Sequence, residues 1–590
     1  MRRFLCALYY LAGFSAVACD TPAPPSSEPP KVPAAESVAS ASPSAPAVVE
    51  AKVKPLEKGG ARAASSQRGM VSSEEENATR VGADILAAGG NAIDAAVAVG
   101  YALSVTHHSA GSLGGGGFMI VRLANGGTFA IDYRERAPAA ATVAANEKQL
   151  AKGAHGYASS PVPGVVAGLN LARDRFGSMP LKDLIAPAVR LARDGHVYSK
   201  RQALVLSWFW ERMHDPTLRA ILGRKRALSA GERVKQPSLA KTLEAIASQG
   251  NDGFYRGDVA EKIAKAHKRH GGFVTVEDLA GYRAEVREPL AVDYRGYRVL
   301  TMPPPSMGGI ALVSILLARA NVPGTPPPAD SVESLHLFVE ASRRAYADRR
   351  AVGADPAAID RKALERLLDA RYYAERKPPI DVHKATPSSA VIPIQDAPAP
   401  VESSDTTHFS VVDAQGNAVS CTTTLSAAFG AWVAVPETGV ILSNAMGGFS
   451  PSGVNALAPN KRMASSMTPT IIVAGKQVVG VLGSPGGDTI PSTVSQVVLN
   501  LIDHRMTIDR AIDTGRVHHQ YKPDELRTEK DRAPAAAVVA RLKALGHSVK
   551  PNAVALGNVN GIVFDAATHT AYGFADQRKG GLALGPTPKP

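Results

Sequence analysis

The stretch Asp405-Thr406-Thr407-His408-Phe409-Ser410-Val411-Val412-Asp413 lies two thirds of the way along the chain. Its β-branched and aromatic residues favour a strand, and it begins with two adjacent hydroxyl side chains. If the peptide bond between Asp405 and Thr406 is cut, the hydroxyl of Thr406 is a nucleophile whose own α-amine, with a pKa near ~8, can take the proton. The stretch therefore predicts a chain that activates itself and then acts as a hydrolase or a transferase.

The residues after Thr406 predict a hairpin. If Gln415 lies at the centre of its turn, Asp413 faces Asn417, and the same register places Thr406 opposite Thr424. We therefore expect two hydroxyl groups to meet across this sheet.

The composition is that of a globular protein. The chain has 590 residues, of which 45% are hydrophobic and 20% are charged, so it can bury a large core. The formal net charge is +13, but Lys and Arg are scattered, and the densest local pairs are Arg343-Arg344 and Arg349-Arg350 on a predicted helix. We interpret these pairs as a solvated helix face and expect no nucleic-acid partner.

The N-terminus has the pattern of a secretory signal. Arg2 and Arg3 precede an apolar run that is too short to span a membrane as a mature helix, and the run ends in Ser15-Ala16-Val17-Ala18-Cys19. This end resembles a bacterial lipobox, in which the cysteine is lipidated and becomes the new N-terminus, although Ala16 replaces the commoner leucine. An ordinary signal cleaved nearby, at Ala18 for example, is the alternative.

Residues 20–67 are rich in proline, alanine and serine and are predicted to form a linker. We therefore expect a signal peptide at 1–19, a tether at 20–67 and a catalytic body after it. The predicted location is the periplasm or cell envelope, with membrane contact only through a lipid on Cys19.

Neither a disulfide nor a metal site is predicted. The chain has three cysteines, and only Cys421 remains in the mature body if Cys6 leaves with the signal and Cys19 carries lipid. The pairs His107-His108 and His518-His519 are adjacent residues that point apart on a regular element, without a carboxylate cluster. No Gly-Lys-Ser/Thr follows the glycines 114–117, so nucleotide binding is unsupported and no cofactor is expected.

The pattern of the body predicts a mixture of helices and strands. Order is expected to begin near Gly69. The expected elements are helices at 78–88, 92–105, 239–248, 259–269 and 331–350, a hairpin at 118–123 and 128–134, a mostly helical middle at 164–376 with a rigid loop at 303–309, and a flexible linker at 377–404. Asn91 can cap the second helix, and Arg134 falls at a strand end.

Several separated motifs then occur in order. They are Gly89-Gly90-Asn91-Ala92-Ile93-Asp94-Ala95-Ala96, Leu113-Gly114-Gly115-Gly116-Gly117-Phe118, Asp132-Tyr133-Arg134-Glu135, Met302-Pro303-Pro304-Pro305-Ser306, Thr406-Thr407-His408, Asn460-Lys461-Arg462, Ser465-Ser466-Met467 and Gly483-Ser484-Pro485-Gly486-Gly487. Through them the chain resembles the γ-glutamyltransferase family, also called glutathione hydrolases, from Gly69 to about Gly580.

The resemblance implies an α+β fold, the αββα four-layer sandwich of N-terminal-nucleophile hydrolases. It also implies a precursor that cleaves itself between Asp405 and Thr406 into a large-subunit part, 68–405, and a small-subunit part, 406–590. The two parts would associate as one catalytic domain. Thr406 would attack the γ-amide of a glutamyl substrate, and water or an amine would release the acyl group from the acyl-enzyme.

The resemblance assigns roles to further residues. Thr424 matches the threonine that hydrogen-bonds the nucleophile. Gly486 and Gly487 match the oxyanion-hole glycines, and one such donor is typically worth about 3 to 4 kcal/mol. The residues that match the holders of the substrate α-carboxylate are Arg134, Ser465 and Ser466.

Three positions depart from the family pattern. Ser426, Ala445 and Gly448 align with side chains that surround the substrate α-amino group and that are typically Asn, Gln or Glu, and Asp. Loss of the aspartate removes one member of a charge pair, which costs about 2 to 5 kcal/mol when the pair is buried. The segment from Ala445 to Asn460 is also shorter than in members with a lid, so an open pocket is expected.

These departures leave the substrate open between two enzymatic readings. One is a γ-glutamyltransferase or glutathione hydrolase with altered recognition. The other is a glutaryl-type amidase or acylase of the same superfamily, because a glutaryl group has the carboxylate but lacks the α-amine. A third reading, from another class, is an unprocessed and non-catalytic envelope protein.

Overall fold

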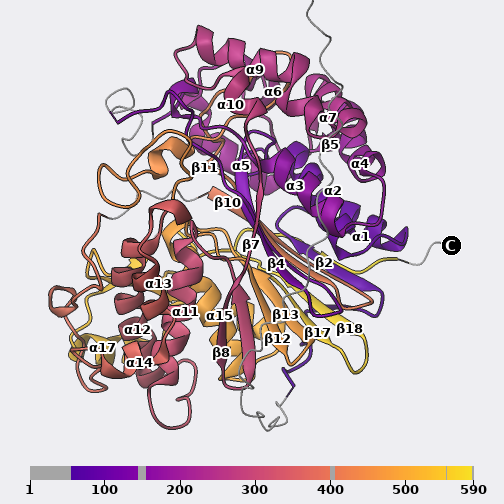
Figure 1. Ribbon diagram of the computed structural model, residues 1–590. Helices are drawn as coiled ribbons and strands as arrows, with labels where there is room; N and C mark the ends of the chain where they lie inside the picture. The colour runs from indigo at the N-terminus through magenta and orange to yellow at the C-terminus, as the bar shows by residue number, and fades with distance from the viewer. Residues whose placement is uncertain (1–54, 144–153, 399–404, 553, 588–590) are drawn as a thin grey trace, which may run out of the picture. The chain divides into compact units, whose positions relative to one another are not determined.

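Two seven-stranded sheets form the centre of the fold in the computed structural model (Figure 1). The structure describes residues 55–143, 154–398, 405–552 and 554–587, so the predicted signal and most of the predicted linker lie outside the described residues. The first sheet has the order β19 (Leu582–Leu584), β2 (Gly69–Ser73), β10 (Asp405–Asp413), β11 (Ala418–Ser426), β3 (Gly116–Arg122), β4 (Thr128–Tyr133) and β7 (Glu285–Arg287).

The second sheet packs face to face on the first, with β10 and β11 against β13 and with β2 and β10 against β17. Its order is β1 (Ala64–Ser66), β18 (Thr570–Ala575), β17 (Asn560–Asp565), β13 (Gln477–Gly483), β12 (Thr470–Ala474), β9 (Tyr297–Thr301) and β8 (Leu290–Tyr294). Two smaller sheets consist of β14 (Val517–His518), β15 (Leu526–Glu529) and β16 (Val549–Asn552), and of β5 (His196–Val197) and β6 (Arg233–Val234).

Helices cover the outer faces of both large sheets, at upper right and lower left in Figure 1. The helices against or above the first sheet are α1 (Glu76–Ala87), α2 (Ala92–Thr106), α3 (Val165–Phe176), α4 (Leu181–Arg193), α7 (Pro237–Gln249), α8 (Asp252–Tyr255), α9 (Gly257–Arg269) and α10 (Val276–Ala280). Those on the side of the second sheet are α11 (Met307–Ala320), α12 (Val332–Val352), α13 (Arg361–Leu367), α14 (Ala370–Glu375), α15 (Ile490–Ile502), α16 (Ile508–Asp513) and α17 (Ala536–Ala544). The predicted αββα sandwich of the α+β class is therefore confirmed.

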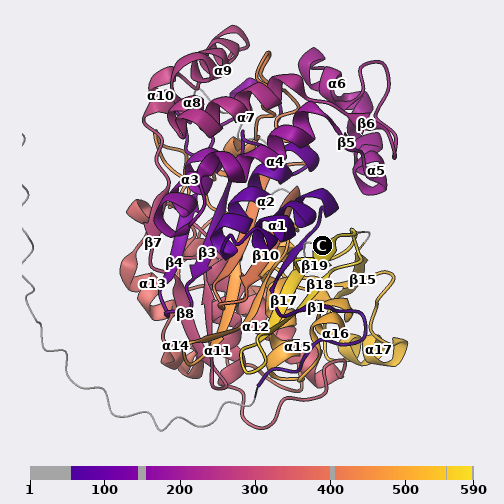
Figure 2. The ribbon, with the colours of Figure 1, turned by 90° about the vertical axis from the view of Figure 1, so that its right-hand side faces the viewer.

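A small lobe, labelled at the upper right of Figure 2, contains α5 (Lys200–Phe209) and α6 (Pro216–Leu222) beside β5 and β6. Its own apolar cluster includes Tyr198, Leu206 and Trp210 and joins the body through Phe429 and Leu425.

Local sequence signals explain why the helices on the first sheet begin where they do. The side chain of Asn91 caps α2, as predicted. It also forms a capping box with Asp94, and all residues of α2 are buried. The cap of α1 is Glu75, because the Glu75 carboxylate accepts from the Ala78 amide.

The expected end of the linker at residue 67 is too late. Leu56 is buried in the core, and β1 pairs with β18 across the edge of the second sheet. The folded body therefore includes residues 56–67. The sequence did not predict this, because an edge strand is held by backbone hydrogen bonds and the composition of this segment gives no sign of them.

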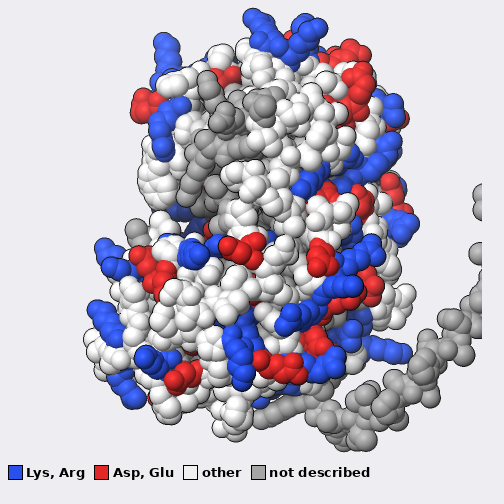
Figure 3. Space-filling view, turned by 60° about the vertical axis from the view of Figure 1, so that its left-hand side comes forward, with Lys and Arg blue, Asp and Glu red and all other residues white. Residues whose placement is uncertain are grey.

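The prediction of a solvated arginine face on α12 is wrong. Arg343, Arg344 and Arg349 are between 2% and 4% exposed, and Glu340 lies one turn before the first two and pairs with both. The exposed face shown in Figure 3 instead has Lys and Arg interspersed with Asp and Glu. The buried Glu340 carboxylate thus balances the Arg343-Arg344 pair, and the half-buried Asp488 carboxylate pairs with Arg349.

Candidate active site

Thr406 lies near the start of β10, a strand in the middle of the first sheet with β2 on one side and β11 on the other. Thr407 faces Thr423 in the register that was predicted from the Asp413–Asn417 turn. A β-bulge separates Asp405 from Thr407, and beside it the Thr406 Oγ1 donates to the Thr424 Oγ1 at 3.2 Å. The two hydroxyl groups therefore meet across the sheet, as expected.

The hydroxyl of Thr424 is fully used. It accepts from the Thr406 hydroxyl and from the Ser426 amide at 2.8 Å, and it donates to the backbone carbonyl of Asp405 at 2.7 Å. A hydroxyl has one hydrogen and two acceptor positions, so each is filled. One side chain thus contacts both the expected nucleophile and the carbonyl group that precedes it.

A small cavity opens beside Thr406. It has room for about one water molecule, about 20 Å³, in this uncleaved chain. Its lining residues are Arg134, Thr406, Thr424, Ser426, Gly448, Ala464, Ser465, Met467, Gly487 and Ile490. None of these described residues carries a carboxylate, so the cavity wall offers a cation for a substrate carboxylate but no acidic side chain for an ammonium group.

Gly486 and Gly487 follow β13 and lead into α15. Their φ values of +136° and +55° are left-handed conformations that favour glycine, and a Cβ on Gly486 would lie 2.5 Å from the Thr489 hydroxyl oxygen. Within the described residues, neither amide N–H donates a hydrogen bond. Two free donors therefore stand at the N-terminal end of α15, where the helix dipole also favours negative charge.

Arg134 follows β4 directly and is 4% exposed. Its Nη1 donates to the Glu135 carboxylate at 2.5 Å, the Glu135 carboxylate also accepts from the Ser443 hydroxyl at 2.8 Å, and the Tyr282 hydroxyl donates to the Arg134 carbonyl at 2.9 Å. These contacts fix a guanidinium at the cavity wall.

The two serines lie differently. Ser465 lines the cavity, whereas Ser466 is fully buried behind it and its hydroxyl accepts from Arg349 at 2.7 Å. The other guanidinium nitrogen of Arg349 donates to the Asp488 carboxylate at 2.6 Å, and the Tyr346 ring lies 4.1 Å from the guanidinium carbon. Arg349 thus ties Ser466 to the residue after Gly487.

Sequence reasoning missed Arg349, Tyr346 and Asp488. The spacing of Tyr346 and Arg349 on one helix face was a usable signal, because residues three apart on a helix are neighbours. Their partner Asp488 lies 139 residues later in the chain and gives no local signal.

The three departing positions are not equivalent. Ser426 and Gly448 line the cavity, whereas Ala445 is fully buried in an apolar cluster with Met446 and Met463. Ser426 has φ +76°, a left-handed conformation at the end of β11. Two of the three therefore lie where a substrate group could contact them.

The histidine beside the nucleophile has a structural environment. Burial lowers the pKa of His408 to about 3, and its ring nitrogens bond to the hydroxyls of Thr422 at 2.8 Å and Ser410 at 3.1 Å. His408 is therefore neutral at physiological pH and a poor candidate for the general base.

One group of potential metal ligands occurs in the described part of the chain: His336, Glu340 and His547. The Glu340 carboxylate is already paired with Arg343 and Arg344, and the two histidine rings bond to each other at 2.7 Å. Two adjacent guanidinium groups oppose a bound cation, so these residues do not fit a metal site.

Comparisons with known proteins agree with this geometry. The protein-family model described as gamma-glutamyltranspeptidase matches residues 78–585. The glutathione hydrolase proenzyme of Escherichia coli (strain K12) is 42% identical over 535 residues, which cover 87% of this chain and 91% of that protein. The acylase ACY 1 proenzyme of Pseudomonas sp. (strain SE83) is 35% identical over 545 residues, 88% and 95% of the respective chains.

The similar solved structures also include both an acylase and a gamma-glutamyltranspeptidase. The cephalosporin acylase from Bacillus halodurans has a TM-score of 0.81 at 28% identity, and the match covers 91% of this chain and 99% of that chain. A Helicobacter pylori gamma-glutamyltranspeptidase chain has a TM-score of 0.50 at 38% identity, and that match covers 54% and 93%.

Proposed function

Because the chain belongs to the γ-glutamyltranspeptidase family, we propose that it is a self-processing glutathione hydrolase and γ-glutamyltransferase with Thr406 as its nucleophile. It breaks γ-glutamyl amides and passes the acyl group to water or to an amine. The observation that carries the proposal is the pair of hydrogen bonds by which Thr424 joins the Thr406 hydroxyl to the Asp405 carbonyl.

Self-cleavage follows from these contacts. The Thr406 Oγ attacks the Asp405 carbonyl carbon while the Thr424 hydroxyl stabilises the charge on the carbonyl oxygen. The C–N bond to Thr406 breaks, the hydroxyl proton ends on that nitrogen, and water then hydrolyses the ester. The products are a carboxylate on Asp405 and a free α-amine on Thr406, which serves as general base in later turnovers.

Substrate turnover uses the same oxygen. Thr406 attacks the γ-amide, the amides of Gly486 and Gly487 stabilise the oxyanion, and the leaving amine takes the proton. Arg134 and Ser465 line the cavity that receives the α-carboxylate, and Arg349 holds Ser466 close behind. Water or an acceptor amine then attacks the acyl-enzyme and regenerates the hydroxyl.

A denaturing gel tests this proposal. The purified wild-type chain separates into two bands on incubation, and the N-terminal sequence of the smaller band begins at Thr406. The Thr406→Ala chain stays as one band and hydrolyses no glutathione. A wild-type chain that remains intact and inactive under these conditions contradicts the proposal and supports a non-catalytic envelope protein.

A second candidate activity is hydrolysis of glutaryl-type amides. The absence of a carboxylate among the described lining residues favours it, and so does the similarity to the two acylases. Competing γ-glutamyl and glutaryl anilides distinguish the two substrates. Rapid turnover of the γ-glutamyl compound with an untouched glutaryl compound excludes this second activity.

The location and anchor belong to the same proposal. No helix in the described residues is long and apolar enough to cross a membrane. We infer export through the N-terminal signal and attachment by a lipid on Cys19, both outside the described residues. Cell fractionation tests the anchor, because Cys19→Ala releases the protein from the membrane fraction if the lipid holds it there.

A further inference from the structure

The small lobe exposes apolar side chains on and beside α5. Val197, Leu204 and Trp208 are 51%, 48% and 54% exposed, and we call these three side chains the lobe patch. Eight large apolar side chains are exposed in the described part of the chain, so three of them fall within twelve residues, and Trp208 is the only aromatic one. Leu204 and Trp208 lie one turn apart on the same face of the helix.

The other face of α5 is already packed. Its buried side chains are Gln202, Val205 and Leu206, and the last two belong to the apolar cluster of the lobe together with Trp210. Figure 2 shows α5 at the edge of the molecule, beside the helices that cover the first sheet. The lobe patch is therefore an outer surface of a complete core, and clustered apolar side chains on such a surface are typical of a contact site.

The lobe is also basic. Residues 197–234 contain eight Lys and Arg residues but only three Asp and Glu residues, whereas the whole chain contains 66 and 53. Among the described residues, no ion pair joins Lys200, Arg201 or Arg212 to a carboxylate. The cations next to the lobe patch are therefore free to meet an anionic partner.

Two of these cations lie against aromatic rings. The guanidinium carbon of Arg201 is 5.5 Å from the centre of the Trp208 ring, and that of Arg212 is 4.9 Å from the Phe209 ring and 5.3 Å from the Trp432 ring. These contacts keep the positive charges beside the apolar surface. Tryptophan and basic side chains on one helix face are the combination that interfacial helices present to anionic lipid headgroups.

We propose that the lobe patch docks on a membrane that contains anionic lipids, with Leu204 and Trp208 in the headgroup region and with Lys200 and Arg201 facing lipid phosphates. This contact goes beyond the proposed function, since it takes no part in catalysis. The membrane is the one to which the inferred lipid on Cys19 tethers the chain. A tether raises the local concentration of the lobe at the bilayer, so a weak contact is enough.

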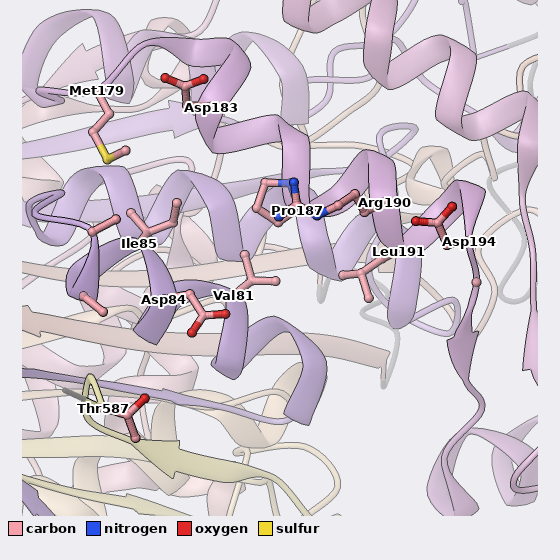
Figure 4. Close-up of a pocket in the computed structure, with 13 residues that line it drawn as sticks. Val81, Asp84, Ile85, Met179, Asp183, Pro187, Arg190, Leu191, Asp194 and Thr587 are labelled. Carbon is pink, nitrogen blue, oxygen red and sulfur yellow. The ribbon is translucent and has the colours of Figure 1, made fainter. Parts of the chain in front are cut away.

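The groove between α1 and α4, drawn in Figure 4, has the opposite charge. Asp84, Asp183 and Asp194 are exposed around it, and Arg190 is the only cation among the described residues that line it. An anionic bilayer repels three carboxylates more than one guanidinium attracts it. The groove therefore does not serve as the docking surface.

Co-sedimentation with lipid vesicles tests the proposal. The protein is the chain from residue 20, which lacks the apolar signal run but contains the whole compact unit that begins at residue 51. Binding to vesicles with phosphatidylglycerol should be at least tenfold tighter than to phosphatidylcholine alone. Trp208→Ser and the double variant Lys200→Gln/Arg201→Gln should each weaken it at least tenfold, because one cation near an anionic surface contributes about fivefold.

Ile392→Ser and the double variant Lys268→Gln/Arg269→Gln are the matched controls outside the lobe. Ile392 is 71% exposed, and Lys268 and Arg269 are exposed neighbours at the end of α9. Each control should leave vesicle binding unchanged within threefold, with near-native circular dichroism in all variants. An equal loss in a control and in its lobe counterpart overturns the proposal, and so does equal binding to the two kinds of vesicle.

Tryptophan fluorescence locates the contact, because the chain has three tryptophans and Trp210 and Trp432 both pack in the cluster of this lobe. Vesicles with brominated acyl chains should quench the emission. Trp208→Phe should still bind, with quenching at least twofold smaller. Vesicle binding without quenching overturns the proposal. Binding of polyglutamate without binding of vesicles also overturns it and indicates an acidic protein partner. Neither self-cleavage nor hydrolysis enters these measurements, so such a failure leaves the proposed function standing.

Discussion

At the scale of single residues, the hydroxyl of Thr424 links the expected nucleophile to the bond that it must first cut. It contacts Thr406 and the carbonyl of Asp405 at the same time. In the proposed mechanism, the same group therefore serves the self-cleavage, which occurs once in the life of the chain, and the nucleophile, which is used in every later turnover.

Replacing this hydroxyl should slow maturation. We expect Thr424→Val to reduce the rate of self-cleavage by about 100-fold or more, because a donor to a developing oxyanion is typically worth ~3 kcal/mol. Thr424→Ser should retain most of the rate. Band intensities on denaturing gels over time measure both.

Thr423→Val is the matched control on the same strand. The Thr423 hydroxyl donates to the Gly116 carbonyl at 3.0 Å, whereas the Thr406 hydroxyl donates to Thr424. Cleavage in this variant should be close to wild type. If the Thr423 and Thr424 variants are equally slow, the effect comes from the strand and not from the hydroxyl beside Asp405.

Gly448 allows a test of the missing ammonium partner. A Cβ there would lie 3.2 Å from the flexible Met463 side chain and 3.8 Å from the Ala464 carbonyl oxygen, so no backbone atom blocks the first carbon of an added side chain. We expect it to raise kcat/KM for glutathione at least about tenfold, since a buried charge pair is worth about 2 kcal/mol or more. Steady-state kinetics on the processed enzyme give the value.

Gly448→Asn, similar in size but uncharged, is the control and should change kcat/KM little. An equal gain from Asn and Asp would mean that shape, and not charge, determines the effect. A loss of activity in both would place the substrate amine elsewhere.

Part of the residue-level site could be predicted from the sequence. The facing of Thr406 and Thr424 follows from simple register arithmetic, because side chains alternate along a strand. The bulge beside Thr406 could not be predicted, because register arithmetic assumes a regular hairpin. The contact of Ser466 with Arg349 could not be predicted either, because the two residues lie 117 positions apart in the sequence.

At the scale of elements, α12 supports the cavity from behind. Arg349 on this helix joins Ser466 to Asp488, and the Tyr346 hydroxyl donates to the Asp488 carbonyl at 2.5 Å. The helix therefore holds both the segment with Ser466 and the turn with Gly486 and Gly487. We regard Arg349 as a positioning residue.

Arg349→Met should lower kcat/KM by at least about 30-fold, because it leaves a half-buried carboxylate without its partner at a cost of ~2 kcal/mol or more. A rise in KM would indicate that Ser466 has moved and substrate binding is weaker. A fall in kcat would indicate that Gly487 has moved and the oxyanion is less well stabilised. Arg349→Lys should restore part of the loss. Kinetics of processed enzyme and urea unfolding of each variant separate these effects from global destabilisation.

The adjacent Arg350→Met is the control for this experiment. Arg350 lies over the Tyr521 ring at 5.4 Å and contacts neither serine. Its replacement should change kcat/KM less than about threefold. A similar loss in both variants would indicate a general effect on α12.

The elements themselves were predicted unevenly. The helices at 239–248, 259–269 and 331–350 correspond to α7, α9 and α12, because each has a clear apolar period. The strands β8 and β9 lie inside the middle region that was expected to be mostly helical. The alternating pattern of these two strands is short, on either side of Arg295-Gly296, and helical patterns surround it. In addition, β9 pairs with β12, which lies far away in the sequence.

At the scale of the whole molecule, buried neutral histidines should make stability sensitive to acid. Burial lowers the pKa of His267 to about 3, and both of its ring nitrogens lack a hydrogen-bond partner among the described residues. The unfolded chain takes up a proton on this residue below about pH 6.5 whereas the folded chain does not, so its contribution to stability falls as the pH drops from 6.5 toward 3.

We expect His267→Leu to reduce the loss of stability between pH 7.5 and pH 5.0 by about 2 kcal/mol, which is the cost of 1.5 pH units for one proton. Urea unfolding of the uncleaved Thr406→Ala chain at both pH values measures it. His569→Leu, on an exposed turn, is the control and should leave the difference unchanged. Parallel pH dependence in all three chains would show that other groups account for the acid sensitivity.

The order of the strands in the sheets could not be predicted from local sequence patterns. A strand such as β2 shows its period in the sequence, but its neighbours β10 and β19 come from positions more than 300 residues away. The layered fold became predictable only through the resemblance to a known family.

Strand order has one more consequence. Cutting the chain before Thr406 leaves β1, β2, β3, β4, β7, β8 and β9 in one polypeptide and β10 to β13 with β17 to β19 in the other, so each of the two large sheets contains strands from both pieces. Neither piece contains all the strands of either large sheet. The cut thus removes the covalent tie without creating separable halves. On dilution, the two pieces can dissociate only if the large sheets unfold. The lifetime of the heterodimer is therefore expected to equal the unfolding time of the whole body.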